Sequence, residues 1–516
     1  MKLILCVAAA ALVAGCASGP AQHAATPVDS DVPPPLVPAM PLPDNAVENA
    51  VGELDELVED LMQKSGVPGL AVAVVHQGKT LYAKGFGVRD TRTGEAVDPD
   101  TVFQLASLSK PLSATVAARQ VGEKTVGWDT PVIDELPWFA LSDPAVSRMV
   151  TVGDLFSHRS GLPDHAGDQL EDLGYDRRAV LEKLRQLPLD PFRISYAYTN
   201  FGLTAGAEAV AAAAGKRWED LAAETLFEPL GMTSTSYRFA DYEARPDRAV
   251  GHIRVDGGYQ PRYVRDADAQ APAGGVSSSV NDLTHWMAMV LADGKYKDTQ
   301  LIDPAALLPA LTPQVVSSRA TEPAMRTGFY GYGFNVGTTS AARTELSHSG
   351  AFELGAGTNV LMLPSADVGI VALTNATMSG VPEALTAQFA DLVQFGEIRE
   401  DWYQLYTGAM LPMSDPVGSL VGVPPPANPV GAQPLPSYLG TYRNNYWGSA
   451  VVSERDGTLQ LALGPKGETV ELKHWDGNVF TFTLVTENAP PGTISKATFD
   501  GPKLTLEYYD DGVFTK

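Results

Sequence analysis

The stretch Phe103-Gln-Leu-Ala-Ser-Leu-Ser-Lys-Pro-Leu-Ser-Ala-Thr115 decides how this chain is interpreted. Its pattern predicts a short strand or loop that runs into a helix, with Pro111 in or near the first turn, where a missing N–H costs least. Residues three apart on a helix share a face, so the amine of Lys110 would lie beside the hydroxyl of Ser107. A neighbouring base is what makes a serine hydroxyl a good nucleophile. Ser-x-x-Lys alone is weak evidence, because a chain this long contains about one by chance.

The N-terminus has the order of an export signal: Met1-Lys2, an apolar run over 3–13, then Ala14-Gly15-Cys16. The apolar run is too short to span a bilayer as a mature helix. Val-Ala-Gly-Cys resembles the bacterial lipoprotein box, which implies a signal peptide over 1–15 and lipidation of Cys16. The protein would then be periplasmic and anchored to the outer membrane. An ordinary signal peptide cut near Ala17 or Ala21 is the alternative.

Composition limits the partners and cofactors that we expect. Both cysteines, Cys6 and Cys16, lie in the leader, so the mature chain can form no internal disulfide. The formal net charge of −24 argues against a nucleic-acid partner. The eight histidines show no metal-binding spacing, and we expect neither a metal nor another cofactor. With 516 residues and 44% hydrophobic content, the chain can build a main domain and a smaller one.

Two proline-rich segments divide the chain. The first is an Ala/Pro-rich tether over 16–45, and the second is a linker over 406–434 that contains Pro424-Pro425-Pro426. We therefore predict a main domain over 46–405 and a small β domain over 435–516. In the tail, Leu459, Leu461 and Leu463 alternate with other residues, and Asp-Gly or Pro-Gly pairs separate such runs at hairpin spacing, which predicts a barrel or curled sheet.

The main domain is predicted to be α/β, with strand-rich ends around a helical middle. A helix over 54–64 ends at Gly66, and a hairpin follows with strands over 70–76 and 79–85. Further strands are expected over 331–336, 343–348, 358–363 and 368–374, and further helices over 177–187, 202–214, 218–226, 281–291 and 382–395. We expect both ends to share one sheet covered by helices, with a ligand cleft between this sheet and a helical lobe.

Two more groups of residues are candidates for a site. Tyr198-Thr-Asn200 precedes a predicted helix, where alternation in an extended loop would place a phenol and a carboxamide on one side. His348-Ser-Gly350-Ala351 lies at the end of a predicted strand, where the glycine would let a substrate approach backbone donors. Taken alone, the aromatic residues are more often packing residues of a strand, and a lone histidine is more often structural.

Together and in this order, the three groups resemble the serine β-lactamase-like hydrolases related to class C β-lactamases and D,D-carboxypeptidases. The resemblance runs from about Leu54 to Val393 and includes four further segments: Leu155-Phe-Ser-His-Arg-Ser-Gly-Leu-Pro163, Leu226-Phe-Glu-Pro-Leu-Gly-Met232, Ala273-Gly-Gly-Val-Ser-Ser-Ser279 and Asp282-Leu-Thr-His-Trp-Met287. It implies the β-lactamase/transpeptidase-like fold, an antiparallel sheet with flanking helices and a helical lobe. The tail, with Tyr438-Leu-Gly-Thr-Tyr442, resembles the lipocalin-like C-terminal domains of some members.

The resemblance also implies roles for individual residues. Ser107 matches the nucleophile, Lys110 the amine that helps to deprotonate it, and Tyr198 a phenol that shuttles a proton. Asn200 would orient the lysine and the substrate. A phenol with a pKa of about 10 acts as a base only where a cation stabilises its anion, and Lys110 is the cation available. His348 and Gly350 would line the substrate cleft, and the backbone N–H groups of Ser107 and Ala351 would form the oxyanion hole.

One difference from the class C enzymes concerns the substrate. They carry Lys-Thr-Gly where this chain has His348-Ser-Gly350, and a neutral imidazole offers less positive charge to a substrate carboxylate. We therefore expect an exported serine hydrolase of small-molecule or peptide substrates, with D-amino-acid peptidase, carboxypeptidase-like or esterase activity. A true β-lactamase and a catalytically inactive binding or sensor lipoprotein are the alternatives. The oligomeric state stays open.

Overall fold

The computed structural model describes residues 33–516. The expected signal peptide, Cys16 and most of the tether lie outside the described residues. The chain divides into two units, Met1–Pro38 and Ala39–Lys516, and in the first of these the described part contains a 3₁₀ turn at Pro34–Leu36. In the part of the chain that is described, no helix combines the length and the apolar character needed to cross a membrane.

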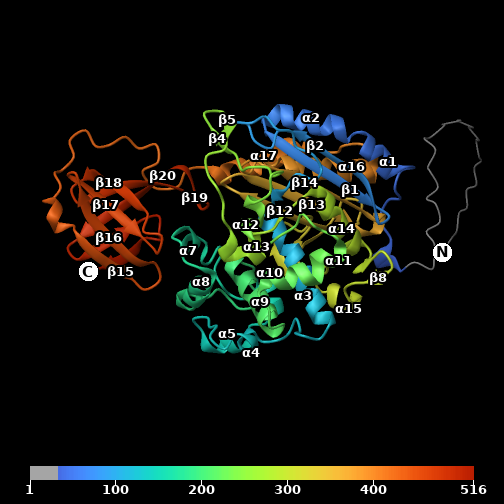
Figure 1. Ribbon diagram of the computed structural model, residues 1–516, viewed down its shortest axis with the longest axis horizontal. Coiled ribbons are helices and arrows are strands. Elements are labelled where there is room, and N and C mark those ends of the chain that lie inside the picture. Colours follow the sequence, from blue (N-terminus) through green and yellow to red (C-terminus); the bar gives the residue numbers. More distant parts are fainter. Residues whose placement is uncertain (1–32) are drawn as a thin grey trace, which may run out of the picture. The chain divides into compact units, whose positions relative to one another are not determined.

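The second unit contains an eight-stranded antiparallel sheet in the order β2-β1-β14-β13-β12-β11-β10-β9 (Figure 1). The two ends of the main domain share this sheet, as the sequence predicted, because β1 pairs with β14. The strands are β1 Gly69–His76, β2 Lys79–Gly87, β9 Val315–Ser318, β10 Gly328–Tyr330, β11 Asn335–Thr338, β12 Thr344–Phe352, β13 Ala356–Leu363 and β14 Val368–Thr374. The hairpin turn at Gln77-Gly78 is also as predicted.

One predicted strand is wrong. The segment 331–336 is mostly the turn between β10 and β11, in which the N–H of Gly331 donates to the carbonyl of Phe334. Gly333 has a φ of 75°, and a Cβ there would lie 2.6 Å from the carbonyl oxygen of Lys110. Glycine is therefore needed for this close approach of the turn to the helix that carries Lys110.

Helices cover both faces of the sheet (Figure 1). On one face lie α1 Ala46–Gly52, α2 Leu54–Ser65 and α16 Val381–Phe395, with α17 Trp402–Met410 against α16. On the other face lie α14 Val280–Leu291 and the turn before α3. In β1, Leu70, Val72 and Val74 join the core on the first face, while Ala71, Ala73 and Val75 join the core on the second. Burial on both faces explains why this strand is apolar throughout.

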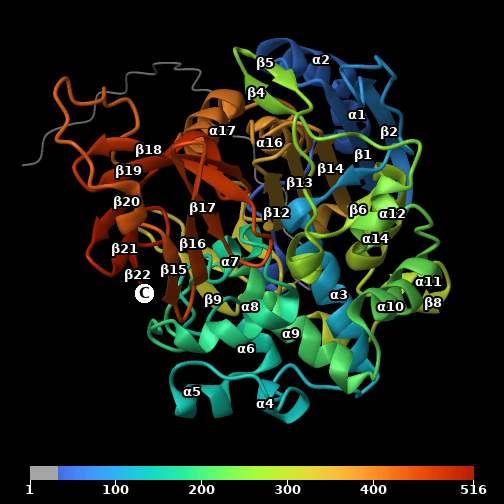
Figure 2. The same ribbon diagram turned by 60° about the vertical axis from the view of Figure 1, so that its left-hand side comes forward.

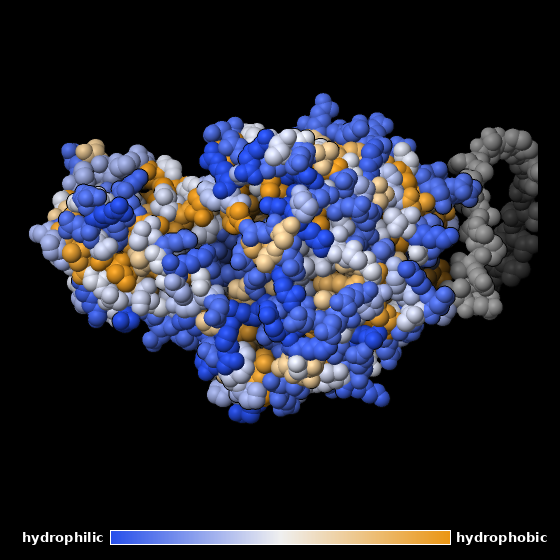
Figure 3. Space-filling view, viewed as in Figure 1, coloured by the Kyte–Doolittle hydropathy of each residue, from blue (hydrophilic) through white to orange (hydrophobic). Residues whose placement is uncertain are grey.

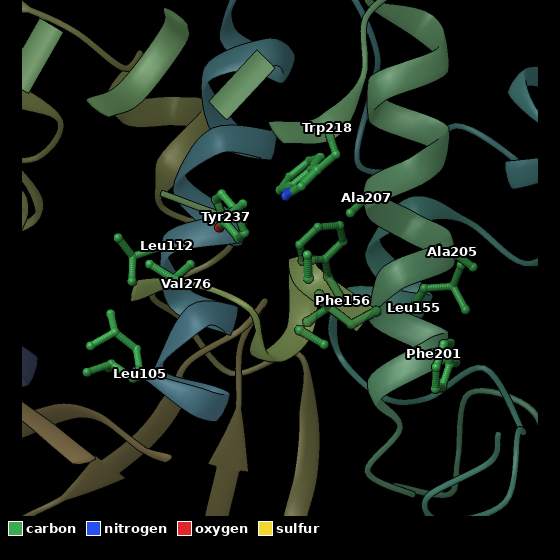
Figure 4. Close-up of a cluster of buried hydrophobic side chains, with 14 of the residues drawn as sticks. Leu105, Leu112, Leu155, Phe156, Phe201, Ala205, Ala207, Trp218, Tyr237 and Val276 are labelled. Atoms are coloured by element: carbon green, nitrogen blue, oxygen red, sulfur yellow. The ribbon is translucent and has the colours of Figure 1, made fainter. Parts of the chain in front are cut away.

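The helical lobe is built around α3 Ser109–Gly122 and α9 Asn200–Ala213. Phe156 lies between these two helices (Figure 4), and a Cβ at Gly206 of α9 would come within 3.1 Å of its ring. The other helices are α4 Val132–Glu135, α5 Pro144–Met149, α6 Val152–Phe156, α7 Asp168–Asp172, α8 Arg177–Lys183, α10 Trp218–Ala222, α11 Glu228–Leu230, α12 Phe239–Glu243, α13 Ala271–Gly274 and α15 Pro304–Leu307. The helices predicted over 177–187 and 218–226 continue beyond α8 and α10 as a 3₁₀ turn and a π-helical turn.

Three short strand pairs join the loops: β3 Phe103–Gln104 with β6 Ser277–Ser278, β4 Ile253–Val255 with β5 Gly258–Gln260, and β7 Lys295–Tyr296 with β8 Thr299–Gln300.

The tail folds into a closed antiparallel barrel, coloured orange to red in Figure 2. Leu459, Leu461 and Leu463 all point into its core, as the alternation predicted. The strands are β15 Gly440–Asn444, β16 Gly448–Arg455, β17 Thr458–Leu463, β18 Thr469–Asp476, β19 Val479–Thr486, β20 Ala489–Asp500, β21 Lys503–Leu506 and β22 Gly512–Thr515.

The barrel and the main domain are joined by more than a free linker. The linker was expected to begin at residue 406, which lies inside α17, and the following segment pairs with the barrel where the N–H of Ile494 donates to the carbonyl of Val417. Buried residues of both parts belong to one continuous apolar cluster, and Tyr175, which packs against it, donates from its hydroxyl to the carbonyl oxygen of Trp447 in the barrel at 3.2 Å. On the face shown in Figure 3, hydrophobic residues lie in small groups among hydrophilic ones, which is usual for a protein surface.

Candidate active site

Ser107 lies in the 3₁₀ turn Ala106–Leu108 that leads into α3. The hydroxyl of Ser109 fixes this turn, because it donates to the carbonyl of Ala106 at 2.6 Å and accepts from the N–H of Val276 at 3.0 Å. One turn later Lys110 faces the same side, and its Nζ lies 2.9 Å from Ser107 Oγ. The helical spacing of the sequence motif therefore brings amine and hydroxyl into contact.

Lys110 Nζ has two further neighbours, and both are hydrogen-bond acceptors. Asn200 Oδ1 lies at 2.7 Å and the carbonyl oxygen of Ala273 at 3.0 Å. A neutral amine can donate two N–H bonds to these oxygens, which leaves its lone pair directed at Ser107 Oγ. The geometry thus suits a base that receives the serine proton.

Asp168 fixes the orientation of the Asn200 amide. Asn200 is the first residue of α9, and its Nδ2 donates to Asp168 Oδ2 at 2.8 Å, so its Oδ1 is turned towards Lys110. The same Asp168 oxygen lies 2.8 Å from Nδ1 of His165. Asp168 is only 3% exposed, so its contact with Asn200 is shielded from solvent, whereas the His165 side chain is 55% exposed.

Tyr198 completes the group of polar side chains around Ser107. It precedes α9, its hydroxyl lies near enough to Ser107 for the serine to oppose part of its pKa shift, and its ring lies 4.5 Å from Lys110 Nζ. Burial raises the pKa of Tyr198 well above its usual range. Burial also lowers the pKa of Lys110 to about 7, although the charge of Asp168 opposes this shift. Both shifts favour the neutral phenol and the neutral amine, so Lys110 is a better base here than a tyrosinate.

Ser107 opens into a cavity of about 290 Å³. Its walls come from the main domain, from Met413 of the segment after α17 and from the barrel. The lining residues are Ser107, His165, Asp168, Tyr198, Asn200, Arg265, Gln270, Gly274, Ala351, Phe352, Glu353, Met378, Met413, Glu487, Asn488 and Pro490. Ser107 and Ala351 lie together on this wall, as an oxyanion hole built from their backbone N–H groups requires.

His348 lies behind the cavity rather than on its wall, which corrects the sequence-based expectation. It is 4% exposed and lies in the middle of β12, which continues to Phe352. Its Nδ1 lies 2.6 Å from the carbonyl oxygen of Ser349, so Nδ1 carries the proton and Nε2 accepts from Tyr330 Oη at 2.9 Å. Burial, together with the nearby Lys110, lowers its pKa to about 3. The imidazole is therefore a neutral packing and hydrogen-bonding group.

Gly350 was expected to line the substrate cleft, but the structure requires a glycine here for a different contact. A Cβ at this position would clash with the carbonyl oxygen of Leu105 and with Thr358 Oγ1, and would lie 2.8 Å from the N–H of Leu108. Glycine thus lets β12 pack against the turn that carries Ser107, rather than admitting a substrate. In this way Gly350 sets the distance between the nucleophile and the strand of Ala351.

Several residues of the site could not be found by sequence reasoning. His165 in a loop and Asp168 at the start of α7 are single polar residues without a motif, and the contribution of Ala273 is a carbonyl group that any residue could supply. Glu487 and Asn488 come from the barrel, far away in the chain. Among residues 33–516, no group of three or more His, Cys, Asp or Glu side chains is arranged to hold a metal ion.

Comparisons with known proteins agree with this fold. A family model described as beta-lactamase matches residues 54–395, and a domain of unknown function, DUF3471, matches residues 424–505. An unguisins hydrolase of Aspergillus violaceofuscus is 26% identical, covering 87% of this chain and 85% of the relative. Penicillin-binding protein 4 of Amycolatopsis lactamdurans is 32% identical, covering 54% of this chain and 74% of the relative. The octameric penicillin-binding protein homologue of Pyrococcus abyssi, 19% identical, has a TM-score of 0.58 and is aligned over 88% of this chain and 98% of its own.

Proposed function

The chain belongs to the beta-lactamase family of serine hydrolases, and we propose that it cleaves amide or ester bonds through an acyl-enzyme on Ser107. The observation that carries this proposal is the environment of Lys110, whose Nζ lies 2.9 Å from Ser107 Oγ and meets two acceptors on its other sides. A binding protein without catalytic activity would have no use for a buried amine held in this way.

In the proposed reaction, Ser107 Oγ bonds to the substrate carbonyl carbon as its proton passes to Lys110. The negative charge that develops on the carbonyl oxygen is stabilised by the backbone N–H groups of Ser107 and Ala351. Tyr198 relays the proton to the leaving group, whose bond to the carbonyl carbon then breaks. Water then attacks the carbonyl carbon of the Ser107 ester while Lys110 and Tyr198 remove a proton from the water. The bond between this carbon and Ser107 Oγ breaks as Oγ regains a proton, so Ser107 is regenerated.

We propose peptides or amides of D-amino acids, or small esters, as substrates in preference to β-lactams. Penicillins and cephalosporins carry a carboxylate, and the buried, neutral His348 cannot supply a positive charge for it. A true β-lactamase is the second candidate, supported by the family itself. The two candidate functions predict different rankings of kcat/KM among four substrates, which are nitrocefin, a nitrophenyl ester, a D-amino-acid amide and a D-alanyl-D-alanine peptide.

Labelling and mutation together test the nucleophile. A fluorophosphonate probe should label Ser107, and Ser107→Ala should lose both labelling and turnover while its circular dichroism spectrum stays unchanged. Neighbouring Ser109, whose hydroxyl is engaged with Ala106 and Val276, should carry no label. An adduct on another residue, or turnover in Ser107→Ala, would contradict the proposed mechanism.

Export and anchoring are also proposals, and they rest on the order of charges, apolar residues and small residues before Cys16. Metabolic labelling with a palmitate analogue should mark the wild-type protein in the outer-membrane fraction and should fail with Cys16→Ser. Unlabelled wild-type protein that is nevertheless exported would refute lipidation and favour an ordinary signal peptide.

A further inference from the structure

The turn between β12 and β13, residues 353–355, begins two residues beyond Ala351. Ala351 supplies one of the two backbone N–H groups proposed for the oxyanion hole, and such donors must lie about 2.7 to 3.1 Å from the oxyanion. On one side of Ala351, Gly350 packs closely against the turn that carries Ser107. The position of the Ala351 N–H therefore also depends on what holds residues 353–355 on the other side.

The barrel holds this turn through Glu487. The N–H of Glu353 donates to Glu487 Oε1 at 2.9 Å, and the N–H of Leu354 donates to Oε2 at 3.4 Å. Both residues lie beyond the last pair of the ladder between β12 and β13, so the sheet uses neither N–H. Glu353 is only 8% exposed, and a buried N–H that loses its acceptor is costly. The conformation of the turn thus depends on the Glu487 carboxyl group.

Glu487 is itself held in place by the main domain. It lies in the turn between β19 and β20, and its neighbours Thr486 and Asn488 both contact Asp172. Thr486 Oγ1 donates to Asp172 Oδ2 at 2.7 Å, and the backbone N–H and Nδ2 of Asn488 donate to the same oxygen at 3.2 and 3.0 Å. In addition, Arg265 Nε lies 3.6 Å from Glu487 Oε2. The carboxyl group therefore has little freedom to move.

We propose that Glu487 is a positioning residue which the barrel contributes to the active site: by holding residues 353–355, it places the Ala351 N–H in the oxyanion hole. This inference rests on the proposed function. Weaker support of the turn would reduce stabilisation of the oxyanion in the transition state, with little effect on binding of the uncharged substrate carbonyl. The expected signature is a lower kcat at an unchanged KM.

Two substitutions of Glu487 separate the reach of its side chain from its acidic character. Glu487→Asp keeps the carboxyl group but withdraws it by one methylene group, so it cannot reach both N–H groups. Glu487→Gln keeps the length and the oxygen that accepts from Glu353. With a nitrophenyl ester, Glu487→Asp should lower kcat and kcat/KM equally, by about 10- to 100-fold. Glu487→Gln should stay close to the wild-type values.

Glu507→Asp is the matched control. Glu507 is another barrel glutamate whose carboxylate accepts from backbone N–H groups, those of Lys496 at 3.1 Å and Ser419 at 3.3 Å, but it is not part of the cavity wall. Its shortening should leave kcat and KM unchanged. Asp172→Ala tests the positioning from outside the cavity, because Asp172 does not line it, and it should lower kcat by releasing the turn that carries Glu487.

The proposal is overturned if Glu487→Asp keeps the wild-type kcat, if Glu487→Gln loses as much as Glu487→Asp, or if the loss appears only in KM. A wild-type kcat in Asp172→Ala would also overturn it. Thermal unfolding shows whether each variant is folded, and Asp172→Ala and Glu487→Gln still decide if Glu487→Asp is not. A wild-type enzyme that neither reacts with the fluorophosphonate nor cleaves any of the four substrates would instead refute the proposed function.

Discussion

Replacing Asp168 by asparagine should move the pH dependence of acylation in a direction that identifies Lys110 as the base. Asn200 Nδ2 and His165 Nδ1 both contact Asp168 Oδ2, so the amide oxygen of Asp168→Asn can keep both contacts. The new NH₂ group would occupy the place of Oδ1, which has no hydrogen-bond partner. The substitution therefore removes a negative charge with little change in shape.

The expected shift follows from the distance between the two charges. Asn200 bridges them, with Lys110 Nζ 2.7 Å from its Oδ1 and Asp168 Oδ2 2.8 Å from its Nδ2. With the amide between them, the charges lie about 7 Å apart and attract by about 2 kcal/mol at an effective dielectric constant of about 20. This energy corresponds to roughly 1.5 pKa units. Because Asp168 favours protonated Lys110, its loss should lower the lysine pKa from about 7 by this amount.

The assay is the rate of Ser107 labelling by a fluorophosphonate between pH 4.5 and pH 9. Only neutral Lys110 accepts the serine proton, so the wild-type rate should rise with pH, with a midpoint near 7. In Asp168→Asn the midpoint should fall by roughly 1 to 2 units. Asp164→Asn, which removes a neighbouring carboxylate that is 66% exposed, should shift it far less because solvent screens the charge. An unchanged or higher midpoint in Asp168→Asn would refute Lys110 as the base.

Three further predictions concern the relay, the packing and the buried charges. Tyr198→Phe should lower the labelling rate by about 100-fold or more without moving its pH midpoint, and a near-wild-type rate in stopped-flow measurements would contradict the relay. Gly350→Ala should destabilise the fold by about 1 to 3 kcal/mol in urea unfolding, because the new methyl group meets the Leu105 carbonyl, and wild-type stability would contradict this. Arg265→Met should lower the free energy of unfolding by about 3 to 5 kcal/mol at pH 8, because it leaves the buried Glu171 carboxylate without its cation. Burial already raises the pKa of Glu171, and losing Arg265 raises it further, so the loss of stability should become smaller as the pH falls and the carboxyl takes up a proton; a loss that does not depend on pH would disprove this origin.

Much of the fold could be predicted because it depends on local patterns. Glycines predicted the turns, and alternating or continuous runs of apolar residues predicted the strands. Together these patterns predicted the β1–β2 hairpin, β14 and the barrel strands. The strand predicted over 331–336 failed because glycines and aromatic residues there form a turn whose close contact with α3 has no local signal. The helix predicted over 218–226 was also interrupted, by a π-helical turn.

The candidate site was predictable in part for the same reason. Ser107 and Lys110 are one helical turn apart, so their contact follows from helix geometry alone. The motif identified His348, but it could not show that this side chain is buried, because the burial depends on Tyr330 and on the neighbouring strands. Likewise, the sequence could not show whether the lysine or the phenol is the better base, because pKa shifts reflect burial by residues from distant parts of the chain.

The sequence by itself determined the family motifs, several of the strands and helices and the β-rich character of the tail, because these depend on spacings of a few residues. Only the tertiary structure decided what surrounds the nucleophile: Asp168 behind Asn200, the carbonyl of Ala273, and Glu487 from the barrel. These contacts join residues that are tens to hundreds of positions apart. Hydrogen bonds and electrostatic interactions act through space at short range, so the chemistry of the cavity is fixed by packing rather than by any local pattern.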